Sequence, residues 1–176
     1  MRNIFTFFSF FIIGYSKYME TYKFNSEYNY HIFLPKNWME YETDEKNTNA
    51  FFDTLSWTAN LRVTPFNNEI KNVDNFFAEE LAKEDVVKLK WQDFGGIKYI
   101  EKSSEETTYF WELIKNKRLY ICSFTIGNLL EVELIQEIEK VEKVLKSIIN
   151  KYVRHPITAG KLITLVFGKL NLQFHE

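Results

Sequence analysis

The sequence has few of the residues that hold together very small or fibrous chains. A single cysteine, Cys122, occurs in 176 residues, so an intramolecular disulfide is excluded. Only 6 glycines and 3 prolines are present, which argues against a fibrous or low-complexity chain. A domain of this length buries roughly 70% of the surface of its unfolded chain, so folding requires neither a metal nor a disulfide.

The chain also lacks an excess of charge of one sign. Its 22 Lys and Arg residues nearly balance 24 Asp and Glu residues, and the formal net charge is −2. Binding to a phosphate backbone needs a clustered excess of basic side chains, so no nucleic-acid partner is expected. The apolar run Ile4–Gly14 is too short to span a bilayer, and we expect no integral membrane span.

The first 18 residues allow two interpretations. Arg2 precedes the apolar run, and Gly14 and Ser16 form a small-x-small pair, which together outline a secretory signal. Residues 1–16 would then direct export to the periplasm or the medium. Alternatively, Met19 is the true start and the protein is cytoplasmic. In both cases we expect one domain over residues 19–153, followed by a C-terminal extension over residues 154–176.

Aromatic residues are abundant, at 18% of the chain, and they favour strands. Alternating runs predict strands over Tyr28–Leu34, residues 50–56 and residues 59–66, and Pro35 ends the first of them. A turn at Lys36-Asn37 precedes Trp38. This tryptophan is either the floor of a ligand site or a core anchor at a strand end, and we expect the core anchor.

Two β-hairpins are predicted in the middle of the chain. Gly95-Gly96 can form a type I′ turn, which places Trp91 opposite Ile100. The second hairpin turns at Lys115-Asn116 or Asn116-Lys117, and its strands are apolar on both faces. Strands of this kind are covered on both sides, so we expect them at the centre of the sheet.

Two helices are predicted from apolar residues at helical spacing. The first is short, over Val73–Glu84, with Asn72 or Asp74 as its N-cap. The second is long, over Val132–Tyr152, and carries one continuous apolar stripe that suits packing across a sheet. In the C-terminal extension, Gly168-Lys169 is compatible with the turn of a terminal β-hairpin.

The order of these elements resembles the PsbP-like fold, which is shared with DcrB-type lipoproteins and Mog-type Ran-binding proteins. The resemblance covers about Tyr22 to Tyr152 and rests on the stretches FLPKNW (33–38), DNFFAEEL (74–81) and VEKVLKSI (141–148). It implies an α+β fold in which an antiparallel β-sheet is flanked by helices as a sandwich. The lipobox cysteine of the DcrB-type proteins is absent, so no lipid anchor is implied.

Residues that commonly carry catalysis or bind metals are scattered. The three histidines, His31, His155 and His175, lack the spacing of a metal site, and Cys122 has no second cysteine. We expect Cys122 to be a buried, inert thiol and His31 a partly buried structural residue. The sequence contains neither a Gly-x-Ser-x-Gly motif nor a phosphate-binding glycine loop. We therefore predict no catalytic residues, no metal, no cofactor and no enzymatic activity.

Three residues are candidates for binding. Glu112 is a charge within an apolar strand, and it is either a desolvated functional carboxylate or a residue that reaches a helix lysine or the sheet margin. Trp57 and Arg62 belong to the residue types that dominate interfaces, although core packing explains Trp57 and a solvated strand position explains Arg62.

The function that the resemblance implies is non-enzymatic. Its members are photosystem accessory subunits, a binder of a small GTPase, and chaperones of secreted effectors. We therefore expect a protein-binding or accessory module whose partner is another protein, either chaperone-like or of the immunity type that sequesters a toxin. The alternative is a small enzyme or a small-ligand-binding protein with an aromatic-lined pocket. The sequence does not determine the oligomeric state.

Overall fold

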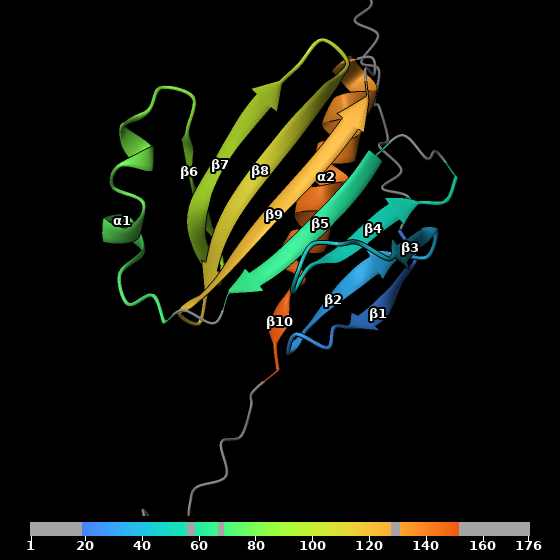
Figure 1. The fold of residues 1–176 in the computed structure, drawn as a ribbon, viewed down its shortest axis with the longest axis horizontal. Helices are drawn as coiled ribbons and strands as arrows, with labels where there is room; N and C mark the ends of the chain where they lie inside the picture. The colour runs from blue at the N-terminus through green and yellow to red at the C-terminus, as the bar shows by residue number, and fades with distance from the viewer. Residues whose placement is uncertain (1–18, 56–58, 67–68, 128–130, 152–176) are drawn as a thin grey trace, which may run out of the picture.

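Two antiparallel sheets and one long helix form the part of the chain that the computed structural model describes, residues 19–55, 59–66, 69–127 and 131–151 (Figure 1). The larger sheet has seven strands in the order β3-β4-β5-β9-β8-β7-β6, and the smaller has the order β1-β2-β10. The predicted α+β class is confirmed. The predicted segments 1–18 and 154–176, with the terminal hairpin, lie outside the described residues.

The strands follow the predicted runs closely in the first half of the chain. Their bounds are β1 Thr21–Asn25, β2 Tyr30–Pro35, β3 Trp38–Tyr41, β4 Asn49–Asp53, β5 Ala59–Phe66, β6 Val87–Trp91, β7 Phe94–Lys102, β8 Glu106–Lys115, β9 Arg118–Gly127 and β10 Ile149–Asn150. The helical elements are α1 Val73–Phe76, the single 3₁₀ turn η1 Glu80–Ala82, and α2 Glu131–Lys146.

The turn before Trp38 is the place where the chain leaves one sheet for the other. β2 ends at Pro35, and β3 begins at Trp38 after Lys36 and Asn37. The Asn37 side-chain amide donates a hydrogen bond to Asp53 at 2.6 Å, which fixes the turn against β4. Trp38 is only 2% exposed, and its ring stacks on Phe124 with 6.4 Å between ring centroids. It is a core anchor, as predicted.

The main core lies between α2 and one face of the seven-stranded sheet, which we call the inner face. Helix α2 crosses this face behind β5, β8 and β9 (Figure 1). Val141, Val144 and Leu145 of α2 are at most 1% exposed and belong to one cluster with the inner-face residues Trp111 and Leu113. The smaller sheet adds Tyr30, Ile32 and Leu34 to the same cluster. A single apolar core therefore joins both sheets and the helix.

The prediction that the last helix runs to Tyr152 is wrong. Helix α2 ends at Lys146, and β10 follows and pairs with β2, with Ile149 opposite His31. The side chain of Asn150 explains this end, because it accepts a hydrogen bond from the Tyr120 hydroxyl and donates one to the Lys115 carbonyl. These two contacts hold the segment extended beside the sheet. Ile148 remains fully buried, as the apolar stripe predicted.

The opposite face of the large sheet, which we call the outer face, is covered at one end by α1 and η1. The prediction of one continuous helix over Val73–Glu84 is wrong, because a turn separates α1 from η1. A helix this short is marginal on its own, so its shape follows its contacts with the sheet. Asn72 caps α1 as predicted and accepts a hydrogen bond from the Asn75 amide at 3.0 Å. The predicted anchors Val73, Phe77 and Leu81 pack against outer-face residues, which are Ile97, Ile114 and Leu119.

The predicted Gly95-Gly96 turn is also wrong. β6 and β7 are joined at Gln92-Asp93 with Trp91 opposite Phe94, so both glycines lie inside β7. A Cβ atom on Gly96 would lie 2.1 Å from the Glu112 carbonyl oxygen, so this position needs glycine for close approach rather than for a turn. The register differs from the prediction by an even number of residues. Trp91 and Ile100 therefore share the inner face as expected, although they are not paired.

The second predicted hairpin is confirmed. Its turn is Asn116-Lys117, and both residues have positive φ, 51° and 68°, which a type I′ turn requires. β8 and β9 are interior strands of the seven-stranded sheet, as predicted. The inner-face side chains of β8 and β9 contact α2. A ligand or partner that binds these strands would therefore contact their outer-face side chains.

Replacing Leu145 with alanine tests the docking of α2. The side chain is fully buried in the main core, so we expect a loss of about 2–5 kcal/mol in the free energy of unfolding. Ile135 on the same helix is 53% exposed and provides the control, with an expected loss within about 0.5 kcal/mol on replacement with alanine. Urea unfolding measures both values. A Leu145→Ala loss as small as that of the control would mean that α2 is not docked on the sheet.

Replacing Gly96 with alanine tests the close approach of β7 to β8. The new methyl group would overlap the backbone of Glu112, and we expect a loss at or above the upper end of the range of about 1–3 kcal/mol typical of overpacking. A Cβ on Gly127 meets no atom of the described residues within 4 Å, so Gly127→Ala should change stability by less than about 0.5 kcal/mol. Thermal unfolding measures the stability of both variants. Equal melting temperatures would refute the register of β7 against β8.

Candidate functional site

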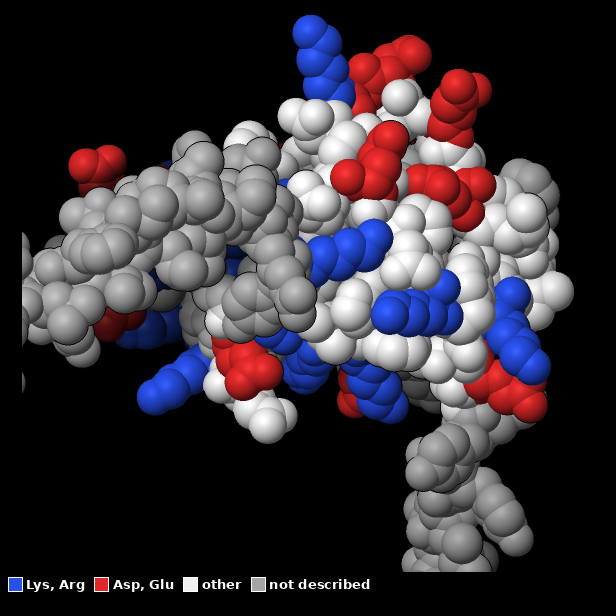
Figure 2. Space-filling view, turned by 90° about the horizontal axis from the view of Figure 1, so that it is seen from below, with Lys and Arg blue, Asp and Glu red and all other residues white. Residues whose placement is uncertain are grey.

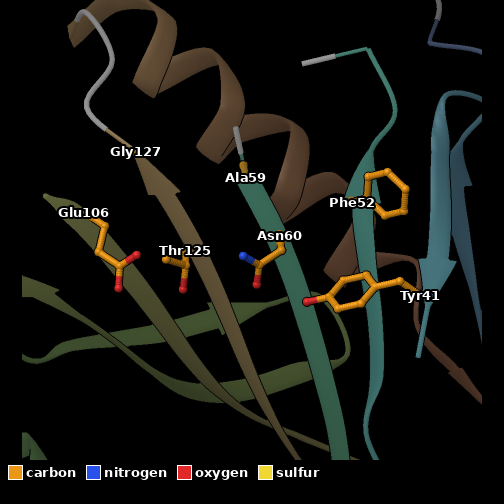
Figure 3. A pocket seen from close by; sticks show the side chains of 7 residues that line it. All are labelled: Tyr41, Phe52, Ala59, Asn60, Glu106, Thr125 and Gly127. Atoms are coloured by element: carbon orange, nitrogen blue, oxygen red, sulfur yellow. The ribbon is translucent and has the colours of Figure 1, made fainter. Parts of the chain in front are cut away.

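The end of the outer face away from α1 carries a hollow of about 450 Å³. We call it the outer-face hollow, and Figure 3 shows the described side chains that line it. They come from β3, β4, β5, β8 and β9, and they are Tyr41, Phe52, Ala59, Asn60, Glu106, Thr125 and Gly127. Five strands that are distant in the sequence therefore contribute to one concave surface.

Strand register explains why these side chains meet. Phe52 lies opposite Asn60, and Asn60 lies opposite Thr125 on the next strand, so all three point to the same face. Figure 3 shows Glu106, Thr125, Asn60 and Tyr41 in a row across the sheet. The rings of Tyr41 and Phe52 meet edge to face with 5.9 Å between centroids. The hollow thus has an aromatic wall at one side and a carboxylate at the other.

The polar side chains of the hollow, on Tyr41, Asn60, Glu106 and Thr125, include both hydrogen-bond donors and acceptors. Thr125 shares a 3.1 Å hydrogen bond with the hydroxyl of Thr108, which belongs to the same row. The side-chain oxygen of Asn60 is buried and has no donor among the described residues. An unmatched buried acceptor is unfavourable until a donor reaches it, so this position favours a ligand that donates hydrogen bonds.

The predicted candidate Arg62 lies on the outer face, one row further along β5. It is opposite Ala50 on one side and Ser123 on the other. Its Nε atom is 3.5 Å from a carboxylate oxygen of Glu45, and its side chain is 32% exposed. Arg62 is therefore a partly solvated strand residue that borders the outer-face hollow.

The predicted candidate Glu112 lies on the same face but not in the same site. β9 separates its strand from that of Arg62, and Glu112 accepts a 3.4 Å hydrogen bond from the Tyr99 hydroxyl. Burial raises the pKa of the Glu112 carboxyl, and Glu80 adds to this, while the Tyr99 hydrogen bond and Lys83 act in the opposite direction. The structure does not bring Arg62 and Glu112 together. The third candidate, Trp57, lies outside the described residues.

Cys122 and His31 occupy structural positions, and His155 and His175 lie outside the described residues. Cys122 is fully buried, and burial raises the pKa of its thiol, as expected of an inert cysteine. His31 is half-buried, meets Phe33 edge to face, and has a pKa that is lowered mainly by burial. Within the described ranges, no three His, Cys, Asp or Glu residues are grouped so that they could hold a metal, and no helix has the length and hydrophobicity needed to cross a membrane.

Sequence reasoning missed most of the outer-face hollow. The signal that points to it is the alternation along β5, where Asn60 and Arg62 are polar while Leu61 and Val63 are apolar. A similar alternation in β9 places Ser123 and Thr125 on the polar side. Tyr41 and Phe52 gave no such signal, because their positions depend on how β3 and β4 pair with β5.

Comparisons with known proteins identify the fold. No protein-family model matches the sequence, and no curated protein sequence matches it. A crystal structure from Bacteroides thetaiotaomicron superimposes with a TM-score of 0.61 at 18% identity over 83% of this chain, which spans 57% of that protein. Cyanobacterial PsbP (CyanoP) from Synechocystis gives a TM-score of 0.50 at 10% identity, over 78% of this chain and 96% of the other. The yeast Ran-binding protein Mog1p gives 0.47 at 8% identity, over 75% and 96% of the two chains.

The chain therefore has the PsbP-like fold that its sequence resembled. At 18% and 10% identity, these similarities concern the fold and do not transfer an activity or a partner. Function has to be argued from the surface of this chain.

Replacing Glu112 with glutamine tests the electrostatic state of this residue. A carboxyl whose pKa is raised on folding costs stability once the pH rises through that pKa, and the cost disappears below the ordinary value of 4.5. We therefore expect Glu112→Gln to be more stable than the wild type at pH 7, with the difference closing towards pH 4. Urea unfolding across this range measures the difference. An NMR titration that places the pKa of Glu112 at or below 4.5 would contradict the argument.

Proposed function

We propose that this chain is a non-enzymatic protein-binding or accessory module that contacts its partner through the outer-face hollow. The observation that supports the proposal is a concave, aromatic-walled surface at the end of the outer face that α1 and η1 do not cover. Tyr41 and Phe52 are half-buried there, and Arg62 lies beside them. Tyrosine, phenylalanine and arginine are enriched at protein interfaces, where aromatic side chains contribute much of the affinity.

The arrangement of the outer face supports the same proposal. α1 and η1 bury Ile97, Ile114 and Leu119 at one end, whereas Tyr41 and Phe52 at the other end are only partly buried. Aromatic and aliphatic area at the second end is accessible to a partner, and its removal from water favours association. The hollow lies on rigid paired strands, so a partner would find a surface that is already formed.

The polar groups of the hollow fit recognition better than catalysis. Catalysis needs a nucleophile with an adjacent base, or an acid and a base placed around a reacting atom. The Thr125 hydroxyl is hydrogen-bonded to another threonine, and Glu106 at the end of the row is exposed to solvent. None of the described lining residues is a cysteine, histidine, serine or lysine.

A second candidate function is the binding of a small molecule. It is favoured by the volume of the hollow, about 450 Å³, which falls within the usual range for ligand pockets, roughly 300–1,000 Å³. The chaperone-like and immunity-type roles that the resemblance implies are two specific forms of the protein-binding proposal. The identity of the partner distinguishes them.

Site-specific photo-cross-linking tests the proposal. The full chain carrying benzoylphenylalanine in place of Tyr41 is produced in its native cell, and adducts are identified by mass spectrometry. The matched control places the same group at Phe33, which is 38% exposed on β2 of the other sheet. We expect a defined protein adduct from position 41 and none of that protein from position 33. Equal adducts from both positions, or no protein adduct from position 41, would overturn the proposal.

Truncating Arg62 then tests the surface with the cross-linked partner. Arg62→Ala should weaken binding by at least about 1–2 kcal/mol, because arginine beside an aromatic surface is a common hot spot. The melting temperature should change little, since the side chain is partly solvated and its contact with Glu45 is long. Lys90→Ala, on the exposed edge strand β6, is the charge-matched control. Equal losses from the two substitutions would place the interface elsewhere.

A further inference from the structure

A second hollow, of about 390 Å³, adjoins the first, and four of the nine described residues that line it are glutamates. We call it the acidic hollow. Its described lining comprises Glu27, Tyr28, Glu40, Tyr41, Glu42, Thr43, Glu45, Thr48 and Asn49. Tyr41 lines both hollows, so a single side chain separates an aromatic surface from an acidic one.

Most of the negative charge at the acidic hollow is not neutralised within the described part of the chain. Four of the six residues 40–45 are Asp or Glu. Glu45 lies near Arg62, and Glu40 accepts a 2.7 Å hydrogen bond from the Asn49 amide. The structure shows no ion pair for Glu27, Glu42 or Asp44 among the described residues, and all three are exposed. Like charges held this close repel one another, and a cationic partner would relieve the repulsion.

The charge on the surface is segregated. Figure 2 shows Asp and Glu side chains gathered along the upper edge of one face, while Lys and Arg side chains gather across its middle. The formal net charge of the whole chain is only −2, but separate parts of its surface therefore carry local electrostatic fields of opposite sign.

The geometry of the carboxylates points to an organic cation rather than a metal ion. A calcium site needs six to eight oxygen ligands that converge on one point. No such grouping of acidic residues occurs in the described ranges, so these carboxylates are spread along a surface. Ammonium and guanidinium groups suit a spread of carboxylates, and their stems and charge can pack on the rings of Tyr28 and Tyr41.

We infer that the partner presents a segment with two or more lysine or arginine side chains in the acidic hollow and an adjoining apolar side chain in the outer-face hollow. The unmatched oxygen of Asn60, at the outer-face hollow, would accept a hydrogen bond from the same segment. This inference rests on the proposed function and adds the chemistry of the partner. It predicts binding that weakens with salt and with loss of carboxylates at residues 42 and 44.

A pair of synthetic peptides tests the inference on the full chain. The probe is a fluorescein-labelled ten-residue peptide of alternating arginine and valine, and its control has glutamate in place of each arginine. Fluorescence anisotropy should show binding of the arginine peptide at least about tenfold tighter than that of the glutamate peptide, and weakening several-fold between 50 and 200 mM salt. Equal affinities, or no binding of the arginine peptide at 1 mM protein, would overturn the inference.

Two charge-matched double variants locate the site. Glu42→Gln with Asp44→Asn should weaken the arginine peptide at least about fivefold, because Glu42 lines the acidic hollow and Asp44 lies two residues further along the same loop. Glu133→Gln with Glu139→Gln removes the same charge from exposed positions on α2 and should change affinity less than about twofold. Equal weakening by both double variants would show that the peptide is attracted by net charge alone and would overturn the site.

Tyr41→Ala should also weaken binding of the arginine peptide at least about fivefold.

The failure of this inference can be distinguished from a failure of the proposed function. If the partner segment cross-linked to position 41 lacks lysine and arginine, the inference of a cationic segment is refuted. The proposal of a protein-binding module is not affected by that result. The absence of any protein adduct would refute the binding module itself.

Discussion

The packing of α2 against the inner face is the interaction on which the rest of the structure depends. Val141, Val144, Leu145 and Ile148 are buried in the cluster that includes Trp38, Trp111 and Phe124 of the large sheet and Ile32 and Leu34 of the small one. Since neither sheet meets the other through strand pairing, the shared apolar core holds them together. Polar contacts then fix the arrangement, notably the Ser26 and Tyr30 hydroxyls, which both donate to the Asn49 side chain across the two sheets.

This packing also determines what remains for function. Because α2 covers the centre of the inner face, the proposed contact with a partner falls on the outer face. α1 and η1 cover only the end around Ile97 and Ile114, and the end around Tyr41 and Asn60 is left concave. Glu40 lies in β3 and the carboxylates of residues 42–45 follow directly on it, so the outer-face hollow and the acidic hollow adjoin at Tyr41. Tyr41 and the neighbouring carboxylates thus lie in one short segment.

The sequence predicted features that depend on local periodicity and missed those that depend on pairing between distant strands. The core position of Trp38, the Asn116-Lys117 turn and the burial of Leu145 all follow from alternation, turn chemistry or helical spacing. The Gly95-Gly96 turn was wrong because the need for glycine at position 96 arises from Glu112 on a neighbouring strand. Helix α2 ends early because Asn150 contacts Tyr120, thirty residues away in the chain. The outer-face hollow required the register of five strands, and only Arg62 at its border was anticipated.

The accessibility of the two ends of the outer face tests the central claim most directly. A soluble paramagnetic probe broadens the NMR signals of methyl groups that it can approach, and the full chain can be measured as it is. We predict strong broadening for the methyl group of Thr125, which lines the outer-face hollow, and little for those of Ile97 and Ile114, which lie beneath α1 and η1. Equal protection at both ends would show that the hollow is covered, and would contradict its proposed role as a binding surface.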